Sequence, residues 1–250
     1  MIDLHTHLLP GVDDGSRTLD NSVRVLERFV ADGVHTVACT SHLNASQAGS
    51  APVAAHAELR AQLQGAAPDG IRLLQGFEIM LDRPGCDLTA TGLHLGESRA
   101  VLVEFPRSGL PAESTSELLR LRAAGLVPVI AHPERYRGAT LDTVREWREA
   151  GVVIQGDAMA LLSTGPVTAL SRAMLEEGLF DILASDNHGD RRTLATVRQW
   201  LREFGADAQG ALLTEENPRR VLAGEVAVRV PPVTRERTLW ERLRAMFARR

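Results

Sequence analysis

The feature that most constrains the fold of this chain is a regular alternation of short apolar runs with longer amphipathic stretches. The apolar runs are rich in β-branched residues, whereas Val23, Leu26 and Val30 recur at the spacing of one helix face. Strands are expected at residues 1–7, 34–42, 71–80, 99–106, 126–133, 152–158 and 180–188. Helices are expected at residues 18–33, 52–67, 116–125, 142–151, 168–178 and 194–205. This order predicts an α/β fold with a parallel sheet.

Composition and charge limit the functions that the chain can have. The 250 residues carry a formal net charge of -4, which argues against general nucleic-acid binding because that function needs a basic surface. The two cysteines are too few for a disulfide scaffold. The first residues lack the charged and apolar regions of a secretory signal, and no apolar run approaches the ~20 residues of a spanning helix. We therefore expect a soluble cytoplasmic protein with reduced thiols.

Side chains that can bind divalent metal ions lie at or near the carboxyl end of most of the expected strands. In chain order they are His5, His7, His42, Glu78, Glu104, His132, Asp186 and His188. Five of the eight histidines fall at these positions, a concentration that a random scatter would not give. Active sites of closed parallel barrels form at the C-terminal face from several strand ends, so we expect these side chains to meet there.

The first and the last expected strands carry the strongest local patterns. Strand geometry places His5 and His7 on one face, where both can bind one ion, and Asp186 and His188 repeat that spacing. Asp3 lies on the same face as the two histidines. It either orients a histidine ring or accepts a hydrogen bond from a backbone amide, and the sequence leaves both roles open.

Two adjacent aspartates follow the first strand, in a loop over residues 11–22. Asp13, Asp14 and Gly15 are ordinary turn residues, but a loop at the mouth of a barrel would direct Asp14 at the metals and leave Asp13 in the turn. With Asp14 the candidate ligands number nine, enough for two or three ions. Nitrogen and oxygen ligands without thiolates favour Mn, Fe or Zn over Ca. Such clusters activate water and support in-line phosphoryl transfer.

Several motifs resemble those of one known superfamily. The stretches DLHTHLLPGVDDGS, TSH, GFEI, VEF, VIAHPERY and ASDNH occur in this order between residues 1 and 225. They are similar to the motifs of the PHP (polymerase and histidinol phosphatase) superfamily, and most closely to its bacterial tyrosine-protein phosphatases of capsule and exopolysaccharide loci. The resemblance implies a distorted (βα)7 TIM-like barrel with three divalent metal ions, usually manganese. It also implies dephosphorylation of a membrane tyrosine autokinase of polysaccharide synthesis or export.

The resemblance further assigns a role to each candidate residue. It places His5, His7, Glu78 and Asp186 on the first metal, Glu78, Glu104 and His132 on the second, and Asp14, His42 and His188 on the third. A metal-activated water would attack phosphorus. The phosphate would be held by Arg135 and by either Arg191 or Arg192, because guanidinium offers a fixed fork of donors. The sequence does not separate the last two, and Arg135 could instead form a surface salt bridge.

Three other functions compete with that of a metal-dependent phosphotyrosine-protein phosphatase. A cysteine-dependent phosphatase is excluded, because it needs an arginine six residues after its thiolate and Ala45 and Gly92 occupy those positions after Cys39 and Cys86. A PHP phosphatase for a small phosphate monoester such as histidinol phosphate stays open. A non-catalytic regulator that binds a kinase is disfavoured, because all nine ligand positions are filled.

The end of the sequence differs from the rest. Residues 1–232 contain no linker and are expected to form a single PHP phosphoesterase domain, whereas residues 233–250 form a basic amphipathic tail. The tail has six arginines, two acids, and apolar residues at helical spacing, namely Leu239, Trp240, Leu243, Met246 and Phe247. It either lies on an anionic membrane, bringing the enzyme to a membrane kinase, or is solvated or packed on the barrel.

Overall fold

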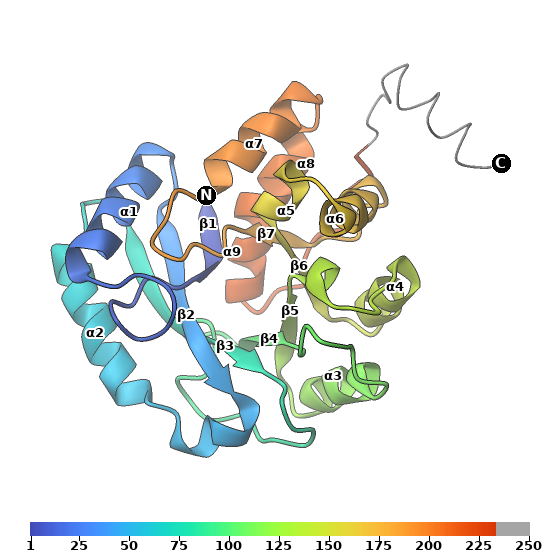
Figure 1. The fold of residues 1–250 in the computed structure, drawn as a ribbon, viewed down its shortest axis with the longest axis horizontal. Helices are drawn as coiled ribbons and strands as arrows, with labels where there is room; N and C mark the ends of the chain where they lie inside the picture. Colours follow the sequence, from blue (N-terminus) through green and yellow to red (C-terminus); the bar gives the residue numbers. More distant parts are fainter. Residues whose placement is uncertain (234–250) are drawn as a thin grey trace.

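The computed structural model describes residues 1–233 and places seven parallel strands side by side in chain order (Figure 1). The strands are β1 (Ile2–Thr6), β2 (Thr36–Asn44), β3 (Arg72–Met80), β4 (Ala100–Glu104), β5 (Val127–Ala131), β6 (Val153–Asp157) and β7 (Ile182–Ala184). Residues after β7 pair with the end of β1: Asp186 N donates to His5 O over 3.1 Å, and His7 N donates to Asn187 O over 2.8 Å. The sheet thus closes into a barrel, which confirms the predicted distorted (βα)7 TIM-like fold.

Helices follow most of the strands and surround the barrel (Figure 1). The six predicted helices are present as α1 (Leu19–Ala31), α2 (Val53–Ala66), α3 (Ser114–Ala123), α4 (Leu141–Glu149), α6 (Pro166–Glu176) and α7 (Leu194–Glu203). The hydroxyls of Thr18, Thr140 and Thr193 accept backbone N–H groups at the starts of α1, α4 and α7. These threonines satisfy amide donors that a helix leaves without intrahelical partners, and so they fix where the three helices begin.

Shorter elements were not predicted, because three to six residues show no clear helical period. They are the helices α5 (Ala158–Leu162), α8 (Asp207–Ala211) and α9 (Asn217–Leu222), the 3-10 helices η1 (Ala45–Ser50) and η2 (Pro133–Arg135), and the π-helical turn η3 (Leu212–Glu216). The connection from β3 to β4, residues 81–99, consists of turns and bends in place of a helix. This connection is the main departure from a regular strand–helix repeat.

Strand residues divide into an inward and an outward row, because successive side chains point to opposite faces of a strand. The inward residues pack together in one apolar cluster, which includes Ala38, Leu102, Val129, Ala131, Val153 and Ile182. The outward residues Val103 and Ile154 belong to another cluster, with Leu118 of α3 and Trp147 of α4. The barrel therefore has an apolar interior and a second apolar layer beneath its helices.

The end of the described chain has no regular secondary structure. Residues 223–233 follow α9, and Val230 and Val233 are buried within this segment. The domain boundary at residue 232 stays a prediction. Apart from Val233, the predicted tail lies outside the described residues. Within residues 1–233, no helix has both the length and the apolar character needed to cross a membrane.

Candidate metal centre

The nine predicted ligands come together at the carboxyl-terminal end of the barrel. They form four overlapping groups, and within each group the donor atoms lie within 4.8 Å of one another. The inward rows of the strands end in these side chains: Glu78 lies four residues after Leu74 on β3, and Glu104 lies two residues after Leu102 on β4. Parallel strands carry their carboxyl ends to the same face, so residues far apart in sequence become neighbours.

The side chain of His132 reaches the centre through an unusual backbone conformation. Ala131 belongs to the inward row of β5, so simple alternation would direct the next side chain outward. His132 has φ +32°, and Asp186 has φ +48°; within residues 1–233 these are the non-glycine residues with positive φ. Such conformations cost about 1–3 kcal/mol each and persist where the surrounding structure holds them. At His132 the left-handed turn breaks the alternation and returns the ring to the centre.

Two histidines and two carboxylates lie close together at the most buried part of the centre. The Nε2 atoms of His5 and His7 are 3.2 Å apart. Asp186 Oδ1 lies 3.3 Å and 3.4 Å from these two atoms, and Glu78 Oε2 lies at the same two distances. Ligands about 2.1 Å from one ion at tetrahedral angles stand about 3.4 Å apart, so each of these distances suits a shared ion. These are the four residues predicted for the first metal, and His5, His7 and Asp186 among them form one of the four groups.

Glu78 also lies beside two further candidate ligands, His132 and Glu104. Its Oε1 lies 2.7 Å from Nε2 of His132, and Oε2 of Glu104 lies 3.8 Å from the same nitrogen. This oxygen of Glu104 is buried and has no hydrogen-bond partner. An unpaired buried carboxylate oxygen is costly, and a cation between Glu78 and Glu104 would compensate its charge. The donor set therefore fits a second divalent metal, which Glu78, Glu104 and His132 would hold.

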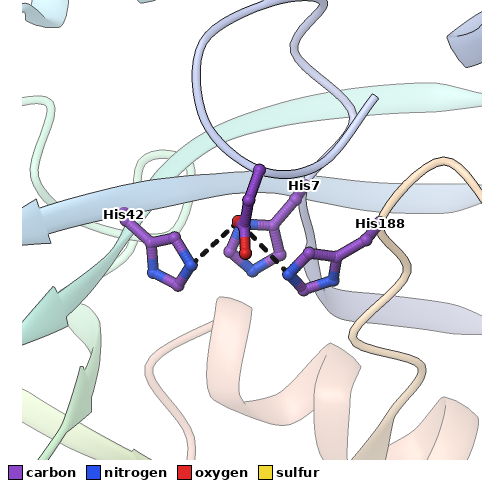
Figure 2. A group of neighbouring side chains, drawn as sticks. His7, His42 and His188 are labelled. Atoms are coloured by element: carbon purple, nitrogen blue, oxygen red, sulfur yellow. Dashed lines mark ion pairs between the residues drawn. The ribbon is translucent and has the colours of Figure 1, made fainter. Parts of the chain in front are cut away.

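The most exposed of the four groups contains His7, Asp14, His42 and His188. The three histidines converge on one point (Figure 2), and Oδ1 of Asp14 lies 3.2 Å from Nε2 of His42 and 3.5 Å from Nε2 of His188. The side chains of Asp14 and His42 are 68% and 38% exposed, compared with 1% for Glu78. The outer group is therefore the side of the centre that a ligand from solvent meets first.

The loop that carries Asp14 packs closely against the end of β1. A Cβ atom on Gly15 would lie 2.1 Å from the backbone oxygen of His7, so glycine alone permits this approach. Asp13 Oδ2 lies 2.8 Å from Nδ1 of His7, and its Oδ1 accepts a hydrogen bond from Gly15 N over 3.0 Å. Asp13, expected only as a turn residue, thus also orients a candidate ligand.

The carboxylates give the centre a negative potential that favours cations. Burial lowers the pKa of His5, but the charges of Glu78 and Asp186 outweigh burial and raise it to about 9. Burial and the neighbouring charge of Glu78 raise the pKa of Glu104 to about 7. The proton held by His5 occupies a position where a metal would supply positive charge, and metal binding would release it. A buried set of imidazoles and carboxylates thus fits divalent transition metals.

Asp3 takes the second of the two roles considered for it. Its Oδ1 accepts hydrogen bonds from the backbone N–H groups of His5 and Ser185, over 3.3 Å and 3.2 Å. Burial raises its pKa to about 6, although hydrogen bonds from Ser185 and His5 oppose that rise. Asp3 therefore joins β1 to the residues after β7, and closes the barrel beneath the centre.

Two of the three predicted arginines lie beside the centre. Arg135 donates from Nη1 to Oδ2 of Asp186 over 2.8 Å and from Nη2 to Oδ2 of Asp157. Nη1 of Arg192 lies 3.6 Å from the same Asp186 oxygen. Arg191 is exposed and forms no ion pair with the described residues. Arg135 thus belongs to a largely buried network rather than to a surface salt bridge.

Two side chains at the centre were missed from the sequence. Gln155 and Asp157 extend the inward row of β6 beyond Val153, and Oε1 of Gln155 lies 2.9 Å from Nδ1 of His5. β6 carries no histidine, and the acid at its end, Asp157, is not part of a metal-ligand pattern, so residue type alone did not indicate a role for this strand. The available signal was the placement of polar residues at alternate positions of an otherwise apolar strand.

The fold and the site together define a class, that of TIM-like barrels with a candidate multinuclear metal centre at the C-terminal face. Residues 1–223 match the family model described as capsular polysaccharide synthesis, CpsB/CapC, and the chain belongs to this family. The chain is 28% identical to tyrosine-protein phosphatase YwqE of Bacillus subtilis (strain 168), over 93% of this chain and 95% of that protein. It is 27% identical to tyrosine-protein phosphatase CpsB of Streptococcus pneumoniae, over 90% of this chain and all of that protein.

A solved structure agrees with this placement. It comes from a study of YwqE from Bacillus subtilis and CpsB from Streptococcus pneumoniae, described as unique metal-dependent tyrosine phosphatases. It matches with a TM-score of 0.80 and 28% identity, over 95% of this chain and 100% of that one. A phosphotriesterase from Mycobacterium tuberculosis matches with a TM-score of 0.55 and 14% identity, over 88% of this chain and 93% of that one, and shows the fold alone.

Proposed function

We propose that the chain is a metal-dependent protein-tyrosine phosphatase, which hydrolyses phosphate monoesters of protein tyrosines. The observation that carries this proposal is the convergence of nine nitrogen and oxygen donors at one end of the barrel. Membership of the CpsB/CapC family, whose relatives are named tyrosine-protein phosphatases, supports the choice of substrate. Two arginines beside the donors add groups of the kind that bind phosphate oxygens.

The proposed cofactors are three divalent metal ions, with manganese as the first choice and iron or zinc as alternatives. His5, His7, Glu78 and Asp186 would hold the first, Glu78, Glu104 and His132 the second, and Asp14, His42 and His188 the third. Ions in such a centre supply Lewis acidity, which activates water and stabilises charge on phosphoryl oxygens. The protein's own contribution is to fix the spacing of the donors and to keep most of them away from bulk water.

The substrate phosphate would be held by Arg135 and Arg192. Both guanidinium groups lie beside Asp186, whereas the exposed Arg191 makes no ion pair with this aspartate. Phosphotyrosine would approach from the more exposed side, past Asp14 and His42. The position at the end of the barrel suits a protein substrate, because a tyrosine on a mobile segment can reach it from outside.

A membrane tyrosine autokinase of polysaccharide synthesis or export is the proposed partner. The capsular polysaccharide description of the family supports this choice. Contact of residues 233–250 with an anionic membrane stays a prediction, as does the cytoplasmic location. Sedimentation with anionic vesicles, with and without residues 233–250, tests the first, and cell fractionation tests the second. Equal sedimentation of the two chains would end the membrane hypothesis.

The decisive experiment is a panel of phosphosubstrates with defined metals. The purified chain is stripped with a chelator, reloaded with Mn, Fe or Zn, and given a phosphotyrosine peptide or histidinol phosphate at equal concentration. We expect hydrolysis of the peptide, restored best by Mn, and two to three ions per chain by elemental analysis. A clear preference for histidinol phosphate would overturn the proposed substrate. Metal content near zero with no hydrolysis would favour a non-catalytic regulator.

A further inference from the structure

Among the seven described strands, β6 is the one with no predicted metal ligand in it or in the few residues after it, yet its inward row ends in two polar residues. Gln155 is fully buried and Asp157 is 5% exposed. On the basis of the proposed function, we propose that both are positioning residues. Gln155 holds the ring of His5 for metal binding, and Asp157 holds the guanidinium of Arg135 for phosphate binding.

Gln155 determines which nitrogen of His5 carries the proton. Its Nε2 donates to the backbone oxygen of Gly156 over 2.9 Å, so its Oε1 faces Nδ1 of His5, also over 2.9 Å. An amide oxygen only accepts, and therefore Nδ1 must carry the hydrogen. Nε2 of His5, which lies 3.3 Å from oxygens of both Glu78 and Asp186, is then the nitrogen that binds metal.

Asp157 fixes Arg135 against the centre, and is itself held at two points. Its Oδ2 accepts from Nη2 of Arg135, while Nη1 of the arginine contacts Oδ2 of Asp186. Its Oδ1 accepts the N–H of Met159 over 2.8 Å at the start of α5, and its backbone N donates to Oε1 of Glu134 over 2.8 Å. Arginine has five N–H donors. Two carboxylates thus hold the guanidinium in place and leave further donors for a phosphate.

The test of Gln155 is the affinity for Mn, measured by competition with a chelator and independent of hydrolysis. Gln155→Leu removes the acceptor, and we expect the affinity for the tightest ion to fall about 10–100-fold. Gln155→Glu keeps an acceptor for Nδ1, and we expect an affinity within about threefold of the unaltered chain. Unchanged affinity in Gln155→Leu would overturn the role of Gln155. If that variant does not fold, Gln155→Met provides the same comparison.

The test of Asp157 is the affinity of the Mn-loaded protein for inorganic phosphate, measured by calorimetry. Asp157→Asn keeps the acceptor for Met159 and the backbone bond to Glu134 but removes the negative charge that holds Arg135. We expect phosphate binding to weaken about tenfold, a loss in the range of a charge-assisted hydrogen bond, with Mn affinity unchanged. Equal phosphate binding would overturn the role of Asp157.

Asp181→Asn is the matched control. Asp181 is also a buried carboxylate that pairs with an arginine, Arg148 at 3.0 Å, and accepts a backbone N–H, from Ile154 at 3.0 Å. It precedes β7, at the opposite end of the barrel, so we expect this variant to bind Mn and phosphate normally. Equal losses in Asp181→Asn and Asp157→Asn would overturn the inference. Both readouts are binding constants, so a chain that hydrolyses no phosphotyrosine would refute the proposed function and leave this test intact.

Discussion

The two ends of the barrel interior differ in chemistry although the same strands build both. Toward the amino-terminal ends, Leu102, Val153 and Ile182 pack in one apolar cluster. Two residues further along β4 and β6 the inward positions hold Glu104 and Gln155. Buried carboxylates and imidazoles reduce stability unless they are paired or bind cations. The apolar end therefore holds the strands together, so the residues of the polar end can serve metal binding and catalysis at some cost in stability.

The largest effect should come from a change at the polar end. Glu78→Ala removes a carboxylate whose oxygens lie within 3.4 Å of ring nitrogens of four histidines. We expect hydrolysis of a phosphotyrosine peptide to fall by at least about 10³-fold, because two metal positions lose a shared ligand. Metal content should fall with it, while the far-ultraviolet circular dichroism spectrum stays unchanged. Near-normal hydrolysis by this variant would remove Glu78 from the centre.

A change at the apolar end should lower the stability of the fold and leave metal binding unchanged. Leu102 is fully buried on the inward row of β4. Leu102→Ala should lower the free energy of unfolding by about 2–5 kcal/mol, measured by urea denaturation of the metal-free chain, because it leaves a cavity. The folded variant should still bind Mn with unchanged affinity. A variant that kept its stability but lost metal would contradict the division between the two ends.

The same division explains which parts of the site were predictable. Strand runs and their period of two place His42, Glu78 and Glu104 at the ends of inward rows, so residue type and position were enough to predict that they meet. Asp14 and His188 lie in loops after the strands; their positions already marked them as candidate ligands, and the resemblance to a family assigned them to the third metal.

Other features of the site depend on local geometry that the sequence pattern does not indicate. The ring of His132 reaches the centre only because its backbone adopts φ +32°. Asp13 contacts His7 because Gly15 lets the loop approach β1. Gln155 acquires its role from a partner 150 residues away in the chain. Such contacts depend on how strands and loops pack in three dimensions, so residue type alone does not reveal them.

A smaller effect should appear in the pH dependence of the metal-free chain. The pKa of His5 is raised from 6.5 to about 9, so its contribution to stability is present below pH 6.5 and is lost as pH rises through 9. The pKa of Glu104 is raised from 4.5 to about 7, and its contribution is likewise lost as pH rises through 7. The melting temperature of the chelator-treated chain should therefore fall between pH 6 and pH 9.

Manganese should reverse this trend, because its ligands bind in their deprotonated forms. The increase in melting temperature on addition of Mn should thus be larger at pH 9 than at pH 6. Leu102→Ala should show the same dependence on pH from a lower starting value, since it leaves the polar end intact. A metal-free chain that became more stable toward pH 9 would contradict the negative potential described for the centre.

The smallest effect should come from the thiol of Cys39, on the outward row of the strand that ends near His42. Cys39 is 1% exposed, and burial raises the pKa of its thiol to about 12. Only the thiolate reacts readily with alkylating agents. Iodoacetamide should therefore leave Cys39 unlabelled in the folded chain, as peptide mass spectrometry would detect, and should leave hydrolysis of the phosphotyrosine peptide unchanged. Strong inactivation with an intact circular dichroism spectrum would instead show that a cysteine takes part in the reaction, and would contradict the packing role that the structure gives to Cys39.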